Sequence, residues 1–247
     1  MKSLIKMTWM ETKLFLREPV GAFFTLVFPL MFLFLFGSIY GNAPLTQLNG
    51  QGTVDISVPA YTAMIIATTG LMGLTITMAA YRENGVLRRL QTTPVSPLVV
   101  LAAQVIVLFM MTAFGMILLI IAGKLVYHLR FEGNALSVLA AFGLCSLSFF
   151  AIGFVLAGLM PTARTAQVVG MVILYPMLFL SGAGFPRELL PETIIKVSRF
   201  LPLTYVVTLL RGLWVGDLWS MHLTEVYVLV GILVLGVLIS IKTFRWE

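Results

Sequence analysis

Six long apolar stretches, each free of charged side chains and of histidine, divide the sequence. A helix of about 20 residues, rising about 1.5 Å per residue, crosses the roughly 30 Å hydrocarbon core of a bilayer. The pattern therefore predicts six transmembrane helices, with kinks at Pro29 and Pro176. The predicted spans are Val20–Tyr40, Val58–Ala80, Leu98–Ala122, Ala135–Leu159, Ala166–Phe185 and Val226–Ile241.

The composition fits this pattern, since 60% of the 247 residues are hydrophobic and 11% are charged. These proportions are typical of an all-α polytopic membrane protein, and we expect one membrane domain over residues 1–247. The net charge of +6 indicates cytoplasmic flanks and contact with membrane lipid rather than binding to nucleic acid. Cys145 is the single cysteine, which excludes a disulfide within the chain and a cysteine metal site. We expect no cleaved signal peptide, because the first apolar run is long enough to span.

Lysine and arginine are distributed unevenly between the segments that join the spans. The N-terminal segment has four and the loop after the second span has three, whereas the segment between the first two spans has none. Short cytoplasmic loops are enriched in these residues, so we expect both termini in the cytoplasm. The segment Pro186–Thr224 carries four more on the predicted outer side, but longer segments follow the rule less strictly.

Residues 1–19 have the pattern of an amphipathic helix that ends at Pro19. Its basic face contains Lys2, Lys6, Lys13 and Arg17. Its apolar face contains Leu4, Met7, Leu14 and Phe15, and Trp9 lies near the basic edge. This pattern predicts an interfacial helix on the inner leaflet, and a plain positively charged anchor is a compatible alternative.

Several kinds of chemistry are missing from the sequence. There is no G-x-x-x-x-G-K-[ST] phosphate loop, so the chain has no such nucleotide site to drive transport. The two histidines, His128 and His222, lie outside the predicted spans, which disfavours a metal site or a histidine-based hydrolase. Because the predicted spans hold no ionisable residue, an ion-coupled transporter, a charge-lined channel and an intramembrane enzyme are also disfavoured.

Two of the predicted spans carry small side chains on one face. These are Ala63, Ala67, Gly70 and Thr77 in the second span and Gly153 and Ala157 in the fourth. Small residues let helices approach closely, so we expect packing within the chain, with a subunit interface or a transport path as alternatives.

The loop after the second span reads YRENGVLRRLQTTPVSP, from Tyr81 to Pro97. Glu83 lies near the predicted start of a short helix, where a carboxylate complements the helix dipole. The helix has an apolar ridge of Val86, Leu87 and Leu90, flanked by Arg88 and Arg89, and ends before Pro94 and Pro97. Such a helix either lies on lipid or inserts into a groove of a soluble partner.

The segment over residues 186–218 is too long for a simple turn and is broken by prolines. Pro191 and Pro202 divide it into two short amphipathic helices. We interpret it as a re-entrant hairpin at the outer leaflet, where irregular backbone must be buried in protein or face water.

Together these two segments resemble the membrane subunit of an ABC-type-2 exporter over essentially the whole chain. The family pattern E-x-G-T-L-x-x-L-x-x-T-P is matched by Glu83, Gly85, Leu87, Leu90, Thr93 and Pro94, with Val86 in place of threonine. The later pattern P-x-x-x-x-P, N-P-[LF]-T-[YH] and arginine is matched by Pro186, Pro191, Pro202, Leu203, Thr204, Tyr205 and Arg211, with Leu201 in place of asparagine. Within the family the chain is most similar to daunorubicin-resistance permeases.

The resemblance implies two six-helix permease subunits, as a homodimer or with a close paralogue, and separate cytoplasmic ATP-binding cassette subunits that bind ATP and Mg. It implies that the helix after the second span is a coupling helix seated in the ATPase, with Leu87 and Leu90 as the seat and Glu83, Arg88 and Arg89 as the polar rim. The outer hairpin would cap the pathway. We expect no catalytic residue, metal or cofactor in this chain itself.

The function we expect is that of a permease subunit in a prokaryotic inner membrane, exporting a hydrophobic or amphiphilic compound such as a drug or a lipid-like molecule. A polysaccharide or glycolipid exporter of the same architecture is one alternative. An ATP-independent channel or a membrane assembly factor is another.

Overall fold

The computed structural model describes residues 2–45, 50–91, 96–184 and 191–243, and the regular elements within these ranges are all helices. The α-helices are α1 Lys2–Arg17, α2 Pro19–Ala22, α3 Phe28–Tyr40, α4 Thr53–Thr68, α5 Thr75–Glu83, α6 Val86–Gln91, α7 Pro97–Tyr127, α8 Ala135–Leu159, α9 Ala163–Leu180, α10 Glu192–Ser198, α11 Pro202–Trp214 and α12 Leu223–Thr243. The π-helical turns are η1 Phe23–Val27 and η3 Thr69–Leu74, and a 3-10 turn is η5 Trp219–His222.

Six helical stretches are long and apolar enough to cross a membrane, which confirms the predicted number. They are Phe23–Tyr40, Thr53–Glu83, Val99–Tyr127, Ala135–Leu159, Ala163–Leu180 and Trp219–Thr243. The fourth has the predicted bounds, whereas the predicted end of the fifth, Phe185, lies outside the described residues. The second, third and sixth stretches are longer than predicted, and the fifth begins three residues earlier. The predicted spans themselves hold no ionisable residue, and the ionisable groups lie in the added ends: Asp55, Arg82 and Glu83 in the second, Lys124 in the third, Arg164 in the fifth, and His222, Glu225 and Lys242 in the sixth.

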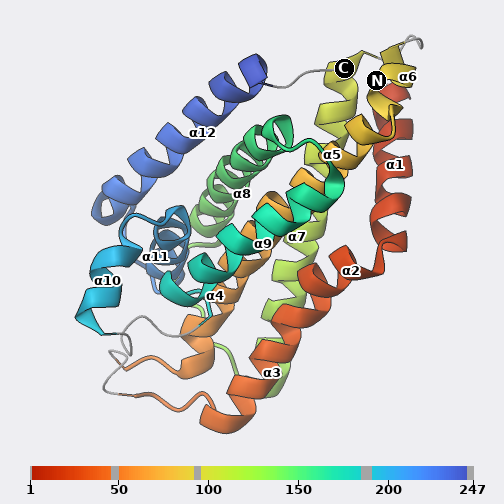
Figure 1. The fold of residues 1–247 in the computed structure, drawn as a ribbon. Coiled ribbons are helices and arrows are strands. Elements are labelled where there is room, and N and C mark those ends of the chain that lie inside the picture. Colours follow the sequence, from red (N-terminus) through yellow and green to blue (C-terminus); the bar gives the residue numbers. More distant parts are fainter. Residues whose placement is uncertain (1, 46–49, 92–95, 185–190, 244–247) are drawn as a thin grey trace.

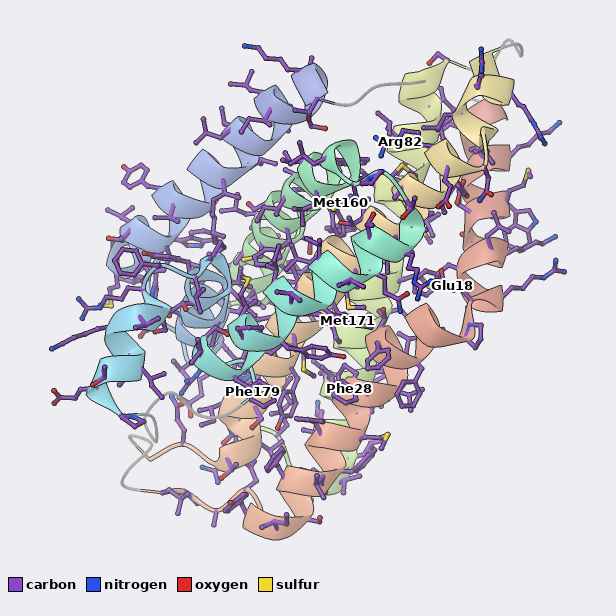
Figure 2. The ribbon with its side chains drawn as sticks, in the orientation of Figure 1. Glu18, Phe28, Arg82, Met160, Met171 and Phe179 are labelled. Atoms are coloured by element: carbon purple, nitrogen blue, oxygen red, sulfur yellow. The ribbon has the colours of Figure 1, made fainter. Side chains whose placement is uncertain are left out.

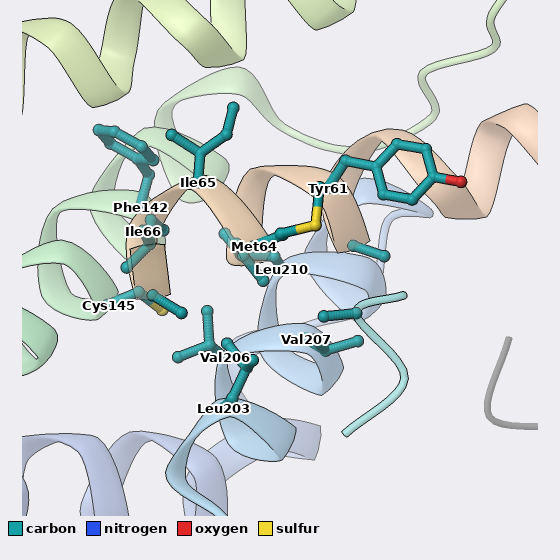
Figure 3. Packing of buried hydrophobic residues seen from close by; sticks show 14 of the residues in the cluster. Tyr61, Met64, Ile65, Ile66, Phe142, Cys145, Leu203, Val206, Val207 and Leu210 are labelled. Atoms are coloured by element: carbon teal, nitrogen blue, oxygen red, sulfur yellow. The ribbon is translucent and has the colours of Figure 1, made fainter. Parts of the chain in front are cut away.

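The centre of the bundle is α4, in which every residue is buried. Figure 3 shows Ile66 of this helix beside Phe142 and Cys145 of α8. The ring of Tyr61 points away from α8 and α11 and meets the ring of Phe32 in α3 edge to face, with 6.1 Å between the ring centres. A helix that is apolar on all sides is stable only where neighbours surround it. By contrast, most of the last span is exposed, as expected for a helix that contacts lipid.

The close approach of η3 to α8 explains two of the small residues in the spans. A Cβ atom on Gly153 would overlap the carbonyl oxygen of Gly70, and the Oγ1 atom of Thr75 donates a hydrogen bond to the carbonyl of Gly153 (3.2 Å). This contact is within the chain, in agreement with the expectation of intramolecular packing.

The two ends of the bundle differ in their elements (Figure 1). At one end lie the start of α1, helix α6 and the last turn of α12; we call this the α6 end. At the other lie α10 and the connections from α3 to α4 and from α7 to α8; we call this the α10 end. The first and last described residues are therefore on one side of the bundle. That this side is cytoplasmic stays a prediction.

Candidate functional site

The last three residues of α5 connect the central span to its neighbours at the α6 end. We call Tyr81, Arg82 and Glu83 the junction. Each of the three side chains forms a hydrogen bond with a different element, namely α1, the last turns of α8 and the first turn of α9.

Tyr81 binds a carboxylate that is almost completely buried. Its hydroxyl group donates to Glu11 of α1, at 2.8 Å from Oε1 and 2.7 Å from Oε2. Glu11 is 3% exposed, and this burial raises the pKa of its carboxyl group, although the hydrogen bond from Tyr81 opposes the change. The sequence analysis did not identify Glu11. Glu11 lies seven residues after Leu4 and four before Phe15, which places it on the apolar face of α1. This spacing could have indicated that its carboxyl group is buried.

Arg82 and Glu83 bind the turn between α8 and α9. The Nη1 atom of Arg82 donates to the carbonyl oxygen of Gly158 (3.1 Å), and the Oε2 atom of Glu83 accepts from the backbone N–H of Ala163 (2.8 Å). Figure 2 shows Arg82 beside this turn, in which Met160 is labelled. A cation at the end of one helix and an anion at the start of the next both complement helix dipoles. The carboxylate of Glu83 was expected at the start of its own short helix. Glu83 is instead the last residue of α5, and its carboxylate accepts a hydrogen bond at the start of α9.

A sharp turn separates the junction from α6. Gly85 has a φ of +66°, in the left-handed region that favours glycine, which explains the glycine of the E-x-G pattern. Helix α6 then runs for six residues and packs against α5 and α7. A short helix therefore follows the second span, as the sequence predicted.

The side chains of α6 differ in part from expectation. Leu87, expected to face a partner, is 1% exposed and is covered by this chain itself. So short a helix needs its apolar side chains to hold it against α5 and α7. Its two arginines therefore lie on the side that faces away from the bundle. Arg88 and Arg89 are exposed, as a polar rim requires. The side chain of Leu90, and the residues Thr93 and Pro94, lie outside the described part of the structure.

The exposed surface of α1 combines basic and apolar side chains. The expected interfacial residues Lys6, Trp9, Lys13 and Arg17 are all exposed. The ammonium group of Lys13 lies 5.1 Å from the centre of the Trp9 ring, a distance that permits a cation–π contact. Leu14, expected on the opposite face, is 49% exposed beside these residues. The composition of this surface suits a lipid interface, and its placement on the inner leaflet stays a prediction.

At the α10 end, α10 and α11 are bent by 101° relative to each other. Pro191 precedes α10 and Pro202 is the first residue of α11. The hydroxyl group of Thr204 donates to the carbonyl of Ser198 (2.6 Å), and that of Tyr205 donates to the carbonyl of Arg199 (2.7 Å). The threonine and tyrosine of the family pattern thus hold the bend.

The rest of this pattern is divided between the core and a small cavity. Leu203 is buried in the core, and Arg211 lines a cavity together with Ser57, Tyr61 and Gly182. Pro186 lies outside the described residues. By length and composition the bent pair is a broken span or a re-entrant loop, so the re-entrant hairpin stays a prediction.

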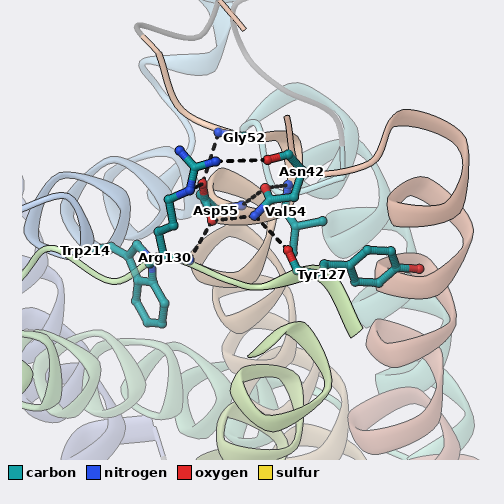
Figure 4. A network of polar contacts seen from close by, with 7 residues as sticks. All are labelled: Asn42, Gly52, Val54, Asp55, Tyr127, Arg130 and Trp214. Carbon is teal, nitrogen blue, oxygen red and sulfur yellow. Dashed lines mark hydrogen bonds and ion pairs between the residues drawn. The ribbon is translucent and has the colours of Figure 1, made fainter. Parts of the chain in front are cut away.

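A buried carboxylate at the α10 end was not identified from the sequence (Figure 4). Asp55 is 4% exposed and accepts from the backbone N–H groups of Gly52 (3.1 Å) and Arg130 (2.9 Å). The amide nitrogen of Asn42 donates to it at 2.9 Å, and the Nε atom of Arg130 lies 4.0 Å away. These partners compensate the cost of burying a charged group.

Asn42 and Arg130 extend the contacts of Asp55 to further elements. Asn42 also donates to the carbonyl of Tyr127 at the end of α7 (3.2 Å). The indole N–H of Trp214, the last residue of α11, donates to the carbonyl of Arg130 (3.1 Å). The network therefore fixes the ends of α4, α7 and α11 relative to one another. It was missed because its members are polar residues that lie just outside the predicted spans.

Sequence comparison identifies the family of this membrane protein. The family model described as ABC-2 type transporter matches residues 2–214, so the chain belongs to the ABC-2 type transporter family. The transport permease ycf38 of Porphyra purpurea is 24% identical over 235 residues, which are 92% of this chain and 79% of that protein. The transport permease YvfS of Bacillus subtilis strain 168 is 25% identical over 206 residues, which are 82% and 81% of the two chains.

A further relative carries a more specific name. YbhR of Escherichia coli K12, named as a multidrug ABC transporter permease, is 23% identical over 161 residues. These residues are 65% of this chain and 44% of YbhR.

Proposed function

We propose that this chain is the permease subunit of an ATP-driven exporter, powered by a separate ATP-binding cassette subunit that docks on α6. The observation that carries the proposal is the junction. It connects an exposed, arginine-bearing helix directly to the central span and to three further elements. A force applied to α6 is therefore transmitted to α1, α8 and α9 as well as to α5. The absence of a phosphate loop from the sequence agrees with an external source of energy.

The docking surface we propose is the exposed side of α6, with Arg88 and Arg89 in contact with the ATPase. Leu87 holds α6 on its own chain and positions the arginines. In this arrangement the chain itself binds no ATP, and ATP and Mg belong to the partner. We further propose that two permease chains and two ATPase subunits form the complex, in a prokaryotic inner membrane with the α6 end in the cytoplasm.

A cavity of about 210 Å³ near the α6 end supports an amphiphilic substrate. Its polar lining residues are Glu18, Thr25, Thr68, Thr77 and Gln167. Its apolar lining residues include Phe15, Phe24, Met72, Ile76 and Leu108. Because polar and apolar groups line the same cavity, it matches a molecule that has both kinds of surface. We propose that a hydrophobic or amphiphilic compound enters the transport path here.

The test is to purify the chain with an ATP-binding cassette ATPase of the same organism that co-purifies with it, and to change Arg88→Glu. We expect this change to abolish co-purification of the ATPase and substrate-stimulated ATP hydrolysis, because it reverses a charge on the docking surface. Lys196→Glu makes the same change in charge on exposed α10 and should leave both intact. The mass of the wild-type complex tests the two-plus-two composition.

Wild-type ATPase binding by the Arg88→Glu variant would show that α6 is not the docking surface. Since the ATPase is cytoplasmic, that result would also remove the support for a cytoplasmic α6 end. Lipids and drugs added to the reconstituted complex, with hydrolysis as the readout, identify the class of substrate.

A further inference from the structure

A groove of about 620 Å³ lies between the outer turns of α7 and α8 at the α10 end, away from the junction and from the cavity near α1. Its walls are formed by Met116, Ile117, Ile120, Lys124, Leu139 and Trp214, among others. The groove opens toward the bilayer, since Ile117 and Leu139 are 47% and 52% exposed. Its volume is in the range of sites that hold a single small ligand.

The aromatic end of the groove offers an apolar surface. The rings of Phe131 and Trp214 meet edge to face, with their centres 4.7 Å apart. The indole N–H of Trp214 is already bonded to the carbonyl of Arg130, so it is not available to a ligand. The ligand part that lies against these rings must therefore be apolar.

Among the described residues that line the groove, Lys124 is the one with a charge. It forms no ion pair with any other described residue, and the nearby acid Asp55 is engaged by Asn42 and Arg130. Lys124 lies in the last turn of α7, at the edge of the membrane span. Met116 lies about 12 Å deeper, given a rise of about 1.5 Å per residue. A cation at headgroup depth with an apolar groove beneath it is complementary to an anionic lipid.

We propose that this groove binds one acyl chain of an anionic phospholipid, with the phosphate at Lys124. A second copy of the chain is the less suitable occupant, because it would have to present an anion at the same depth as Lys124 and an apolar ridge below it. Lipid binding in this groove requires neither an ATPase nor transport. The test of the site is therefore independent of the proposed function.

The experiment is native mass spectrometry of the purified chain with added phosphatidylglycerol or phosphatidylcholine. The wild type should retain phosphatidylglycerol preferentially. Lys124→Gln should reduce this preference about fivefold, the factor expected for one lysine near an anionic headgroup. Lys242→Gln removes a lysine at the α6 end and should leave the preference unchanged.

A second pair of variants tests the groove itself. Leu139→Trp places a larger side chain in the groove lining and should reduce retention of phosphatidylglycerol, whereas Leu136→Trp adds the same ring at a position 76% exposed and outside the lining, and should not. Wild-type retention by Leu139→Trp would overturn the proposal. So would an unchanged preference in Lys124→Gln, or a change of oligomeric state rather than of lipid retention in Leu139→Trp.

Discussion

Glu11 is an acid that is almost completely buried, with 3% of its surface exposed. It is the one acid of α1, and its hydrogen-bond donor is a tyrosine 70 positions later in the chain. Since burial raises the pKa of Glu11 above 4.5, the folded state holds this proton more tightly than the unfolded state does. The contribution of Glu11 to the docking of α1 is therefore fully present below pH 4.5 and is lost as the pH rises through the raised pKa.

The variant Glu11→Gln should remove this dependence on pH. The glutamine oxygen still accepts from Tyr81, but it carries no charge at any pH. Thermal unfolding of the purified chain, followed by tryptophan fluorescence from pH 4.5 upward, should show a decline for the wild type and a flatter profile for the variant. Glu192→Gln, at an exposed position in α10, is the control and should behave as the wild type. Parallel profiles for Glu11→Gln and the wild type would contradict the prediction.

At the scale of the elements, the bundle depends on how closely η3 approaches α8. Gly153→Ala places a methyl group against the carbonyl of Gly70, and the two helices must separate. We expect a loss of about 1–3 kcal/mol in the free energy of unfolding, the usual cost of overpacking. Denaturant unfolding in detergent measures it.

The same helix offers a matched control in Gly143, where an added Cβ would meet no atom within 4 Å. Gly143→Ala should be neutral, or stabilise by about 0.5–1 kcal/mol, because alanine favours the helix. Equal effects of the two substitutions would mean that the η3–α8 crossing does not limit the packing.

At the scale of the whole molecule, the proposed function predicts that the junction separates binding of an ATPase from the response to it. Glu83→Ala removes the bond to α9 but leaves the exposed arginines of α6 in place. We expect the ATPase to co-purify as with the wild type, while stimulation of hydrolysis by substrate falls severalfold. Glu192→Ala at the α10 end is the control. If the variant lost ATPase binding as well as the stimulation of hydrolysis, Glu83 would support the docking surface rather than the transmission of force.

The sequence predicted the spans well because length and apolarity are local properties of the chain. It also predicted a short helix after the second span, from Glu83 near its start and the apolar ridge of Val86, Leu87 and Leu90, and the structure has α6 at Val86–Gln91. The partners of Tyr81, Arg82 and Glu83 were not predictable, because each lies about 70 to 80 positions away and depends on how the helices pack. The burial of Leu87 was missed for a related reason. An apolar ridge on a short helix shows that something covers it, and the pattern does not distinguish the same chain from a partner.

Both described ends of the chain lie at the α6 end of the bundle, which has a consequence for covalent assembly. A soluble domain joined by a flexible linker before Lys2 or after Thr243 begins at the same end of the bundle as Arg88. Its encounter with α6 then becomes intramolecular, with an effective concentration that short linkers set near millimolar. Joining the same domain within the connection from α7 to α8 would hold it on the far side of the bundle. If an ATPase docks on α6 as we propose, it should therefore function when fused at either end of the chain, but not when fused in that loop.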